Sequence, residues 1–249
     1  MLKVRVIPCL TIKDHKLVKS VRFRDHRNIG NYVAAVRVFN ARDVDELIFL
    51  DLDAGKRGIE RWIVEAVTKE CFMPVTLGGG VKTVEDVQLL LSAGADKVAM
   101  NSAVLECPRL IAEASRRYGS QCVVVSIDVR MVHAGWRVFT HGGSADGGKD
   151  AVSWAKEVED LGAGEILLNS IDLDGTMEGY DTELIRAVAD AVRIPVIALG
   201  GAGIPGDCVK AVQAGASAVA AASMFQYTQV TPNVIKRALA DVGFPARIG

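Results

Sequence analysis

Glycine-rich turns that directly follow apolar runs are the parts of this sequence best suited to chemistry. One turn holds Gly200, Gly201 and Gly203, and the small residues Ala222 and Ser223 follow the next apolar run. Turns without bulky side chains let backbone N–H groups close on an anion at the end of a strand. This pattern predicts a phosphate-binding site.

The same arrangement occurs earlier in the chain at a constant offset, so the sequence contains an internal repeat. Gly80 corresponds to Gly201, and Ser102 corresponds to Ser223. The repeat spans about half of the chain, which predicts two similar halves rather than two unrelated domains. Two phosphate sites that face each other would suit a bis-phosphorylated or phosphosugar-type ligand.

Carboxylates at the ends of predicted strands are the acid–base candidates. We favour Asp128, which ends the run VVVSID, as a catalytic group, with a structural cap or ion pair as the alternative. For Asp51, substrate binding and a structural role are equally good interpretations, and Asp174 is either a turn residue or a ligand for substrate hydroxyls. The position that corresponds to Asp128 in the other half is Thr11, which hydrogen-bonds but takes up no proton near neutral pH.

Two connections are too long for simple turns, residues 12–30 and 132–149, and the second is expected to hold a short hairpin. Both follow predicted strands, so we expect them beside the phosphate sites, covering an anionic ligand. For Lys19, in the first connection, the simpler interpretation is a surface charge, and phosphate binding is the alternative.

Charged residues also begin several predicted strands, at the opposite end from the phosphate sites. Arg5, Glu46, Lys97 and Glu165 include two of each sign. Charges that point into a barrel floor must pair, because burial of an unpaired charge is costly. This predicts a structural ring of salt bridges, with a gate toward a partner as the functional alternative.

Apolar runs alternate strictly with amphipathic segments, which predicts eight strand–helix units in a closed parallel barrel. We therefore expect a single (β/α)8 TIM barrel domain over residues 1–249, built from two duplicated half-barrels. The predicted strands are residues 5–10, 46–51, 74–77, 97–100, 122–127, 165–169, 195–199 and 218–222. The predicted helices are residues 33–39, 60–70, 84–92, 108–118, 152–161, 181–191, 206–214 and 232–241.

Composition excludes several classes of function. The net charge is −1, which argues against a nucleic-acid or anionic-membrane surface. The five cysteines show no paired spacing, which indicates reduced thiols and a cytoplasmic protein. The four histidines are irregularly spaced, so we expect no metal site, and no motif calls for a cofactor.

Taken together, the motifs resemble the cyclase-subunit family of imidazole glycerol phosphate synthase. They include RVIPCL, DELIFLD, VVVSID, SIDLDGT and GGAG with AASMF, in that order, over residues 5–225. The resemblance implies a duplicated TIM barrel of the ribulose-phosphate-binding type. It also implies a glutaminase subunit docked on the bottom of the barrel in a heterodimer, with ammonia passing through the barrel interior to the top.

Further roles follow from the resemblance position by position. It implies that the four charged residues at the strand starts form the ammonia gate, that Asp96 contacts the glutaminase, and that Lys19 is a lid lysine. It also makes Asp128 one of two catalytic carboxylates. The implied phosphate-binding residues are Gly79, Gly80, Asn101 and Ser102 in one half, and Asp174, Gly175, Gly201, Gly203, Ala222 and Ser223 in the other.

The main departure is Thr11, where the family has its other essential Asp; Asn169 and Leu199 also replace small hydroxyl residues. A branch that lacks this Asp, and that carries ECFMP before the third strand, resembles the chain more closely. That branch is associated with surface-polysaccharide (lipopolysaccharide-type) synthesis beside an acetamidino-sugar amidotransferase. We therefore predict a divergent, ammonia-conveying synthase subunit. The alternatives are an authentic cyclase of histidine biosynthesis and a non-catalytic barrel that binds a phosphorylated metabolite.

Overall fold

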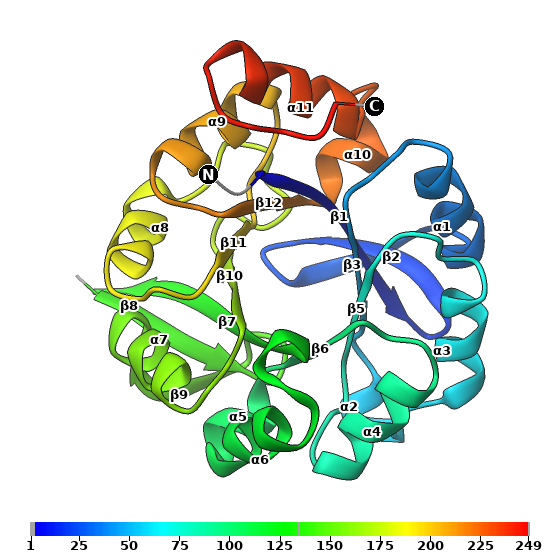
Figure 1. Ribbon diagram of the computed structural model, residues 1–249, viewed down its shortest axis with the longest axis vertical. Helices are drawn as coiled ribbons and strands as arrows, with labels where there is room; N and C mark the ends of the chain where they lie inside the picture. The colour runs from blue at the N-terminus through cyan, green and yellow to red at the C-terminus, as the bar shows by residue number, and fades with distance from the viewer. Residues whose placement is uncertain (1–2, 134, 249) are drawn as a thin grey trace.

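The computed structural model describes residues 3–133 and 135–248, and its eight central strands close into a parallel barrel (Figure 1). The strands run in the order β10-β11-β12-β1-β4-β5-β6-β7, and β7 pairs with β10 to complete the cylinder. The predicted TIM barrel is therefore confirmed. The barrel strands are β1 (Arg5–Lys13), β4 (Leu47–Asp51), β5 (Val75–Gly78), β6 (Lys97–Met100), β7 (Val123–Val132), β10 (Glu165–Ser170), β11 (Val196–Leu199) and β12 (Ala218–Ala221).

A helix follows each barrel strand and packs on its outer side, as the alternating pattern predicts (Figure 1). Side chains at the helix starts explain several boundaries: Thr83 accepts a hydrogen bond from the N–H of Asp86, and Asp86 returns one, forming a capping box. The main helices are α1 (Tyr32–Asn40), α3 (Arg61–Thr68), α4 (Val84–Ser92), α6 (Arg109–Tyr118), α7 (Ala151–Asp160), α8 (Thr182–Ala189), α9 (Pro205–Gln213) and α11 (Pro232–Asp241). Four short helices were not predicted: α2 (Ala54–Arg57), α5 (Ser102–Glu106), η1 (Ser120–Cys122) and α10 (Ser223–Tyr227).

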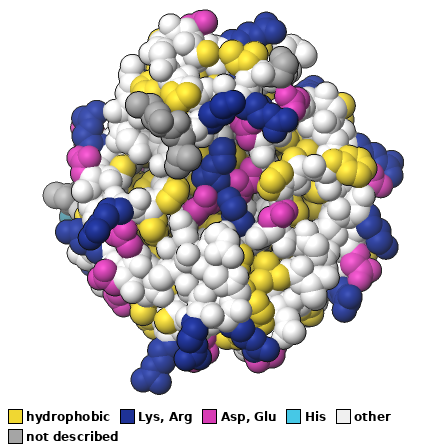
Figure 2. All heavy atoms as spheres, viewed as in Figure 1, with side chains coloured by type: hydrophobic (Ala, Val, Ile, Leu, Met, Phe, Trp, Pro, Cys, Tyr) yellow, Lys and Arg dark blue, Asp and Glu magenta, His cyan; other side chains and the backbone are white. Residues whose placement is uncertain are grey.

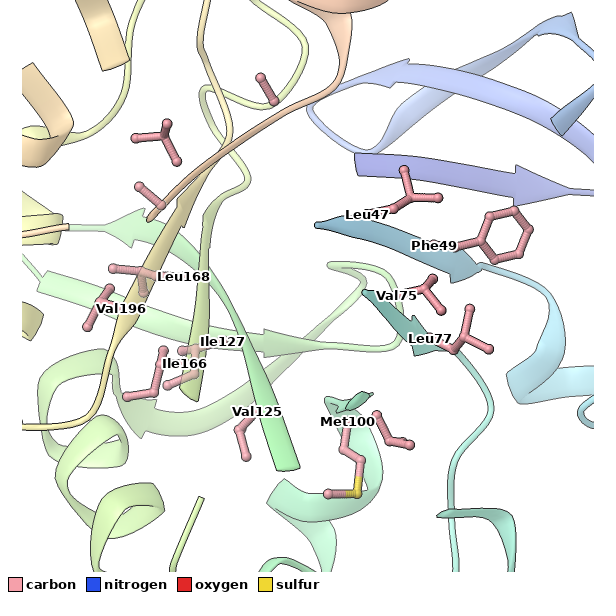
Figure 3. Packing of buried hydrophobic residues seen from close by; sticks show 14 of the residues in the cluster. Leu47, Phe49, Val75, Leu77, Met100, Val125, Ile127, Ile166, Leu168 and Val196 are labelled. Atoms are coloured by element: carbon pink, nitrogen blue, oxygen red, sulfur yellow. The ribbon is translucent and has the colours of Figure 1, made fainter. Parts of the chain in front are cut away.

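Alternate residues of most barrel strands serve two separate apolar cores. On β4, Leu47 and Phe49 point outward against the helices, together with Val75 and Leu77 of β5 (Figure 3). Ile48, between the two, belongs to a smaller cluster inside the barrel. Burial on both faces is why these strands read as continuous apolar runs in the sequence.

Both long connections form antiparallel hairpins at the carboxyl ends of the barrel strands. The second holds β8 (Gly135–Thr140) and β9 (Ala145–Asp150), which confirms the predicted hairpin. The first was expected to be a loop, but it holds β2 (Lys16–Val21) and β3 (Arg24–Gly30), and β2 pairs with an extended β1. Strand β3 is largely exposed, so it has no apolar pattern by which the sequence could have indicated a strand.

A buried lysine fixes the last helix to the bottom of the barrel. Lys236 on α11 is fully buried, and its Nζ lies 2.8 Å from Asp45 Oδ1 and donates to the carbonyl of Asp43 at 2.7 Å. Asp45 also accepts the N–H of Val6 on β1 at 2.9 Å. This pair therefore joins α11, the start of β1 and the segment before β4.

We expect Lys236→Ala to lower the free energy of unfolding by about 3–5 kcal/mol, because it leaves a largely buried carboxylate without its cation. Denaturant unfolding would measure the loss. Arg237→Ala, one residue further at an exposed position, is the matched control and should change stability by less than about 0.5 kcal/mol. Equal effects of the two variants would contradict this role for Lys236.

Candidate functional site

The glycine turn after β11 and the small residues after β12 border a hollow at the barrel mouth. A Cβ at Gly201, where φ is +102°, would overlap the carbonyl oxygen of Gly179, so the close backbone approach requires glycine. Ser223 is buried, and its Oγ has no hydrogen-bond partner among the described residues. The hollow is lined by Asp174, Gly175, Leu199, Gly200, Gly201, Ala202, Ala220, Ala221, Ala222 and Ser223.

Gly203 differs from its neighbours in this turn. Its N–H donates to Asp207 Oδ2 at 3.1 Å, and the N–H of Ile204 donates to the same oxygen at 3.0 Å. The carboxylate therefore already satisfies the N–H groups at the start of α9. Of the predicted phosphate-binding glycines of this half, Gly175 and Gly201 line the hollow, whereas the N–H of Gly203 is already paired.

The corresponding turn in the first half keeps the same backbone form but has a different hydrogen-bond pattern. Gly79, at φ +108°, and Gly80, at φ +73°, pack against the carbonyl oxygens of Asp51 and Ala54. Ser102 Oγ donates to Asn101 Oδ1 at 3.1 Å and accepts the N–H of His141 at 2.9 Å. The two serines are equivalent by repeat, but of the two only Ser223 has a hydroxyl without a partner among residues 3–133 and 135–248.

Asp128 lies within β7, where the strand pairs with both β10 of the barrel and β8 of the hairpin, rather than at the end of the strand. Asn101 Nδ2 donates to its Oδ2 at 3.1 Å. Some of its surface stays accessible, but protein atoms surround the carboxylate, and this burial raises its pKa from 3.8 to about 7. The negative charge of Asp174 raises the pKa further, while hydrogen bonds from Asn169 and Ser126 lower it.

Lys19 is buried, so its interpretation as a surface charge is wrong. The β2–β3 hairpin crosses the mouth (Figure 1) and places Lys19 Nζ 3.9 Å from Asp174 Oδ1. Arg22 anchors the hairpin, because its Nε donates to the carbonyl of Asp172 and its N–H to that of Asp174. Burial raises the pKa of Asp174, and the charge of Lys19 opposes this shift.

Asp51 is engaged in local structure at the end of β4. Its Oδ2 lies 2.7 Å from Arg57 Nη2, and its Oδ1 accepts the N–H groups of Asp53 and Ala54. Burial raises its pKa, and Arg57 opposes that shift. The geometry therefore favours the structural interpretation, in which Asp51 holds the start of α2.

Thr11 shares the inward side of β1 with Arg5, Ile7 and Cys9, as the alternation of a strand requires. Its Oγ1 donates to the carbonyl of Val18 on β2 at 2.8 Å, so the hydroxyl fastens the hairpin. Cys9, below it, was not predicted at the site; burial raises the pKa of its thiol to about 12, which leaves it unreactive.

The four charged residues at the strand starts form a closed ring, as predicted. Arg5 pairs with Glu46 at 2.7 Å and with Glu165 at 2.9 Å, and Lys97 pairs with the same two carboxylates at 3.0 and 2.9 Å. Figure 2 shows acidic and basic side chains gathered at the centre of this view along the barrel axis. Above the ring, the interior is apolar and lined mainly by Ile7, Ile48, Ala99, Val124, Leu167, Ile197, Ala218 and Ala220.

Asp96 is exposed next to Lys97, and its Oδ2 accepts the N–H of Val75 at 2.8 Å. It therefore lies at the same end of the barrel as the ring. No three His, Cys, Asp or Glu side chains among the described residues gather into a possible metal site. In the same part of the chain, no helix has the length and apolar character needed to cross a bilayer.

Asn169 is the site residue whose part the sequence did not reveal. It pairs with Asp128 in the β10–β7 register, and it lowers the pKa of that carboxyl, against the larger effect of burial. Its position in the sequence does indicate an inward side chain, because it stands four residues after Glu165 on the same strand. Only the pairing of β10 with β7, which closes the barrel, brings Asn169 opposite Asp128.

We expect Asp128→Asn to raise the melting temperature at pH 8 and to change it little at pH 4. The folded-state pKa lies above the unfolded value of 3.8, so the folded protein loses stability as pH rises toward about 7. Asp146→Asn is the control with opposite sign, because a hydrogen bond from the Gly148 N–H lowers the pKa of this exposed carboxylate. A stabilisation by Asp128→Asn that is the same at both pH values would contradict the raised pKa.

Comparisons with known proteins show the family of the chain. The family described as "Histidine biosynthesis protein" matches residues 5–231. The chain is 49% identical over 255 residues to "Imidazole glycerol phosphate synthase subunit HisF" of Mycobacterium tuberculosis (strain ATCC 25177 / H37Ra), covering 99% of this chain and 96% of that protein. The protein of the same name from Gluconacetobacter diazotrophicus is 46% identical over 250 residues, covering 99% and 97%.

These names favour the cyclase alternative over the predicted divergent branch, and none of them mentions surface polysaccharides. The family match covers most of the chain and includes the ring, the mouth and both glycine turns. The chain therefore belongs to the histidine biosynthesis protein family.

Proposed function

We propose that the chain is the synthase subunit of an imidazole glycerol phosphate synthase, which adds ammonia to a phosphorylated substrate at the barrel mouth. The observation that carries this proposal is the position of Asp128. Its carboxylate has a pKa of about 7 and stands above an apolar interior that an ion-pair ring closes at the far end. The names of the similar proteins support the same reaction.

A carboxylate with this pKa is suited to move protons near neutral pH. General acid–base catalysis is most effective when the pKa of the group lies near the working pH. Asp128 would remove a proton as ammonia attacks and return one as the product forms. Asn101 holds its Oδ2 in a fixed direction at 3.1 Å.

The substrate phosphate would bind in the hollow beside Ser223, whose hydroxyl has no protein partner among the described residues. Backbone N–H groups of the glycine turn and the nearby cation of Lys19 would favour the anion. A second phosphate would bind at the equivalent turn, near Gly80 and Ser102, if Ser102 exchanges its present partners.

Ammonia would reach Asp128 through the barrel interior. This path suits a small neutral molecule, because apolar walls such as Ile7, Ile48 and Leu167 exclude ions. A glutaminase subunit that docks on the face of Asp96 would deliver ammonia at the ring. Its docking would have to displace at least one ion pair, such as that of Arg5 and Glu46.

Thr11 favours a second candidate, in which the barrel conveys ammonia to an acceptor other than the cyclase substrate. A threonine hydroxyl takes up no proton near neutral pH, and here it is held by Val18. The chain then has one carboxylate where the family's cyclases have two. The surface-sugar function suggested by the sequence resemblance would be of this kind.

Assay of the chain with ammonium chloride and the nucleotide substrate of imidazole glycerol phosphate synthase separates the two candidates. We expect imidazole product, with a loss of about 10²–10⁴-fold in Asp128→Asn, because that variant lacks the proton-transfer group. Thr11→Asp should raise the rate, and Thr11→Ser, which adds no carboxylate, is its control. If the unmodified chain gives no product above background, the cyclase proposal is wrong and the second candidate stands.

The ring makes a separate prediction about ammonia delivery. We expect Lys97→Ala to change the glutamine-dependent rate with the partner glutaminase present, while leaving the rate with added ammonium chloride unchanged. Arg61→Ala, which breaks the exposed pair of Arg61 and Glu65, is the control and should affect neither rate. Equal losses in both assays would argue against a gate and for a purely structural ring.

A further inference from the structure

The hollow beside the glycine turn is smaller than the group proposed to bind there. Its volume is about 10 Å³, which is room for about one water molecule. Ser223 lies in its wall and is 6% exposed, and its Oγ has no partner among the described residues. Buried hydroxyls are nearly always paired, so this one points to a ligand. A phosphate is much larger than a water molecule, so part of the wall has to move before a phosphate reaches Ser223.

The wall of the hollow contains two side chains larger than serine, Asp174 and Leu199, and its other members are glycine, alanine and serine. Asp174 is buried, and the cation of Lys19 lies 3.9 Å from its Oδ1. Leu199 is 6% exposed and belongs to the apolar cluster inside the barrel. No hydrogen bond or charge fixes a leucine side chain, so Leu199 is the side chain that can rotate.

The backbone of the glycine turn has little room to withdraw from the hollow. A Cβ at Gly200, where φ is +93°, would lie 2.7 Å from the carbonyl oxygen of Ser170. A Cβ at Gly201 would overlap the carbonyl oxygen of Gly179. The turn is therefore packed closely against its neighbours, as is usual in protein interiors. Space for a phosphate has to come from Leu199.

The internal repeat shows that this arrangement belongs to the second half alone. By the offset of the repeat, Leu199 corresponds to Gly78 at the end of β5. In the first half the leucine stands on the neighbouring strand: Leu50 pairs with Gly78, and its Cδ2 lies 2.8 Å from the place of a Cβ there. In the second half the neighbouring strand carries Asn169 opposite Leu199. A leucine thus directly precedes the glycine turn only where Ser223 is unpaired.

We propose that Leu199 is a steric gate of the second phosphate site, meaning that a phosphate reaches Ser223 only when the leucine side chain turns away. This inference rests on the phosphate site of the proposed function and names the residue that limits its affinity. Every phosphorylated ligand has to displace the same apolar side chain, so Leu199 weakens phosphate binding in this half whatever the rest of the ligand is.

Titration with inorganic phosphate at constant ionic strength, followed by NMR at the backbone amide of position 223, tests the gate. We expect Leu199→Ala to bind phosphate about 5- to 100-fold more tightly than the unmodified chain, the range that relief of overpacking gives. Leu199→Val removes less of the side chain and should give a smaller gain. It also keeps the test possible if the alanine variant does not fold, which melting temperatures would show.

Leu50→Ala is the matched control. It shortens the leucine that covers Gly78 and does not line this hollow, so it should leave phosphate affinity at position 223 unchanged. Adding Ser223→Ala to Leu199→Ala should cancel most of the gain, because the phosphate then loses the hydroxyl that the gate exposes.

The inference is overturned if neither Leu199 variant binds phosphate more tightly than the unmodified chain, if Leu50→Ala gives an equal gain, or if the gain survives the loss of the Ser223 hydroxyl. None of these measurements requires ammonia, a glutaminase or turnover. A chain that shows the gain but forms no imidazole product would disprove the proposed reaction and support the gate. A chain that forms the product without any gain would support the reaction and disprove the gate.

Discussion

Charges buried at the base of the barrel have to satisfy one another, and the rest of the architecture depends on that constraint. Glu46 is 2% exposed, and its carboxylate is held by Arg5, Lys97 and the hydroxyl of Thr76. Each ring member begins or immediately precedes a different strand, so the four can meet only when the cylinder is closed in the correct register. The ring thus favours one closure of the barrel and separates its apolar interior from the surface below.

At the other end, the same strands deliver polar groups whose charges influence one another. Asp128, Asp174 and Lys19 come from β7, from the segment after β10 and from β2. Asp174 raises the pKa of Asp128, while Lys19 favours the ionised form of Asp174. Because Lys19 belongs to the hairpin over the mouth, the proton affinity at Asp128 depends on a segment that is not part of the barrel. The protonation of Asp128 therefore depends on contacts between segments that are far apart in the sequence.

The frame was largely predictable from the sequence, whereas much of the site was not. Helices α4 and α11 begin and end at the predicted residues, because local signals mark them: a capping box at Thr83 starts α4, and Pro232 starts α11. Lys19 and the β2–β3 hairpin were misjudged because their structure depends on pairing with β1 and covering Asp174, neither of which leaves a local pattern. Asn169 acquires its meaning from a strand more than forty residues earlier in the chain. The names of the relatives, rather than any pattern in the chain, favoured the cyclase over the divergent branch.

A barrel with two similar phosphate sites would bind a ligand with a phosphate at each end equally well in two opposite orientations. The hydroxyl of Ser102 makes the two halves different. It already donates to Asn101 and accepts from His141, whereas the hydroxyl of its counterpart Ser223 has no partner in the described part of the chain. A phosphate could bind Ser223 without displacing any partner, whereas a phosphate at Ser102 would have to displace the N–H of His141 in the β8–β9 turn. The internal repeat therefore does not make the two turns equivalent, because a backbone N–H of the β8–β9 hairpin occupies the serine hydroxyl of only one of them.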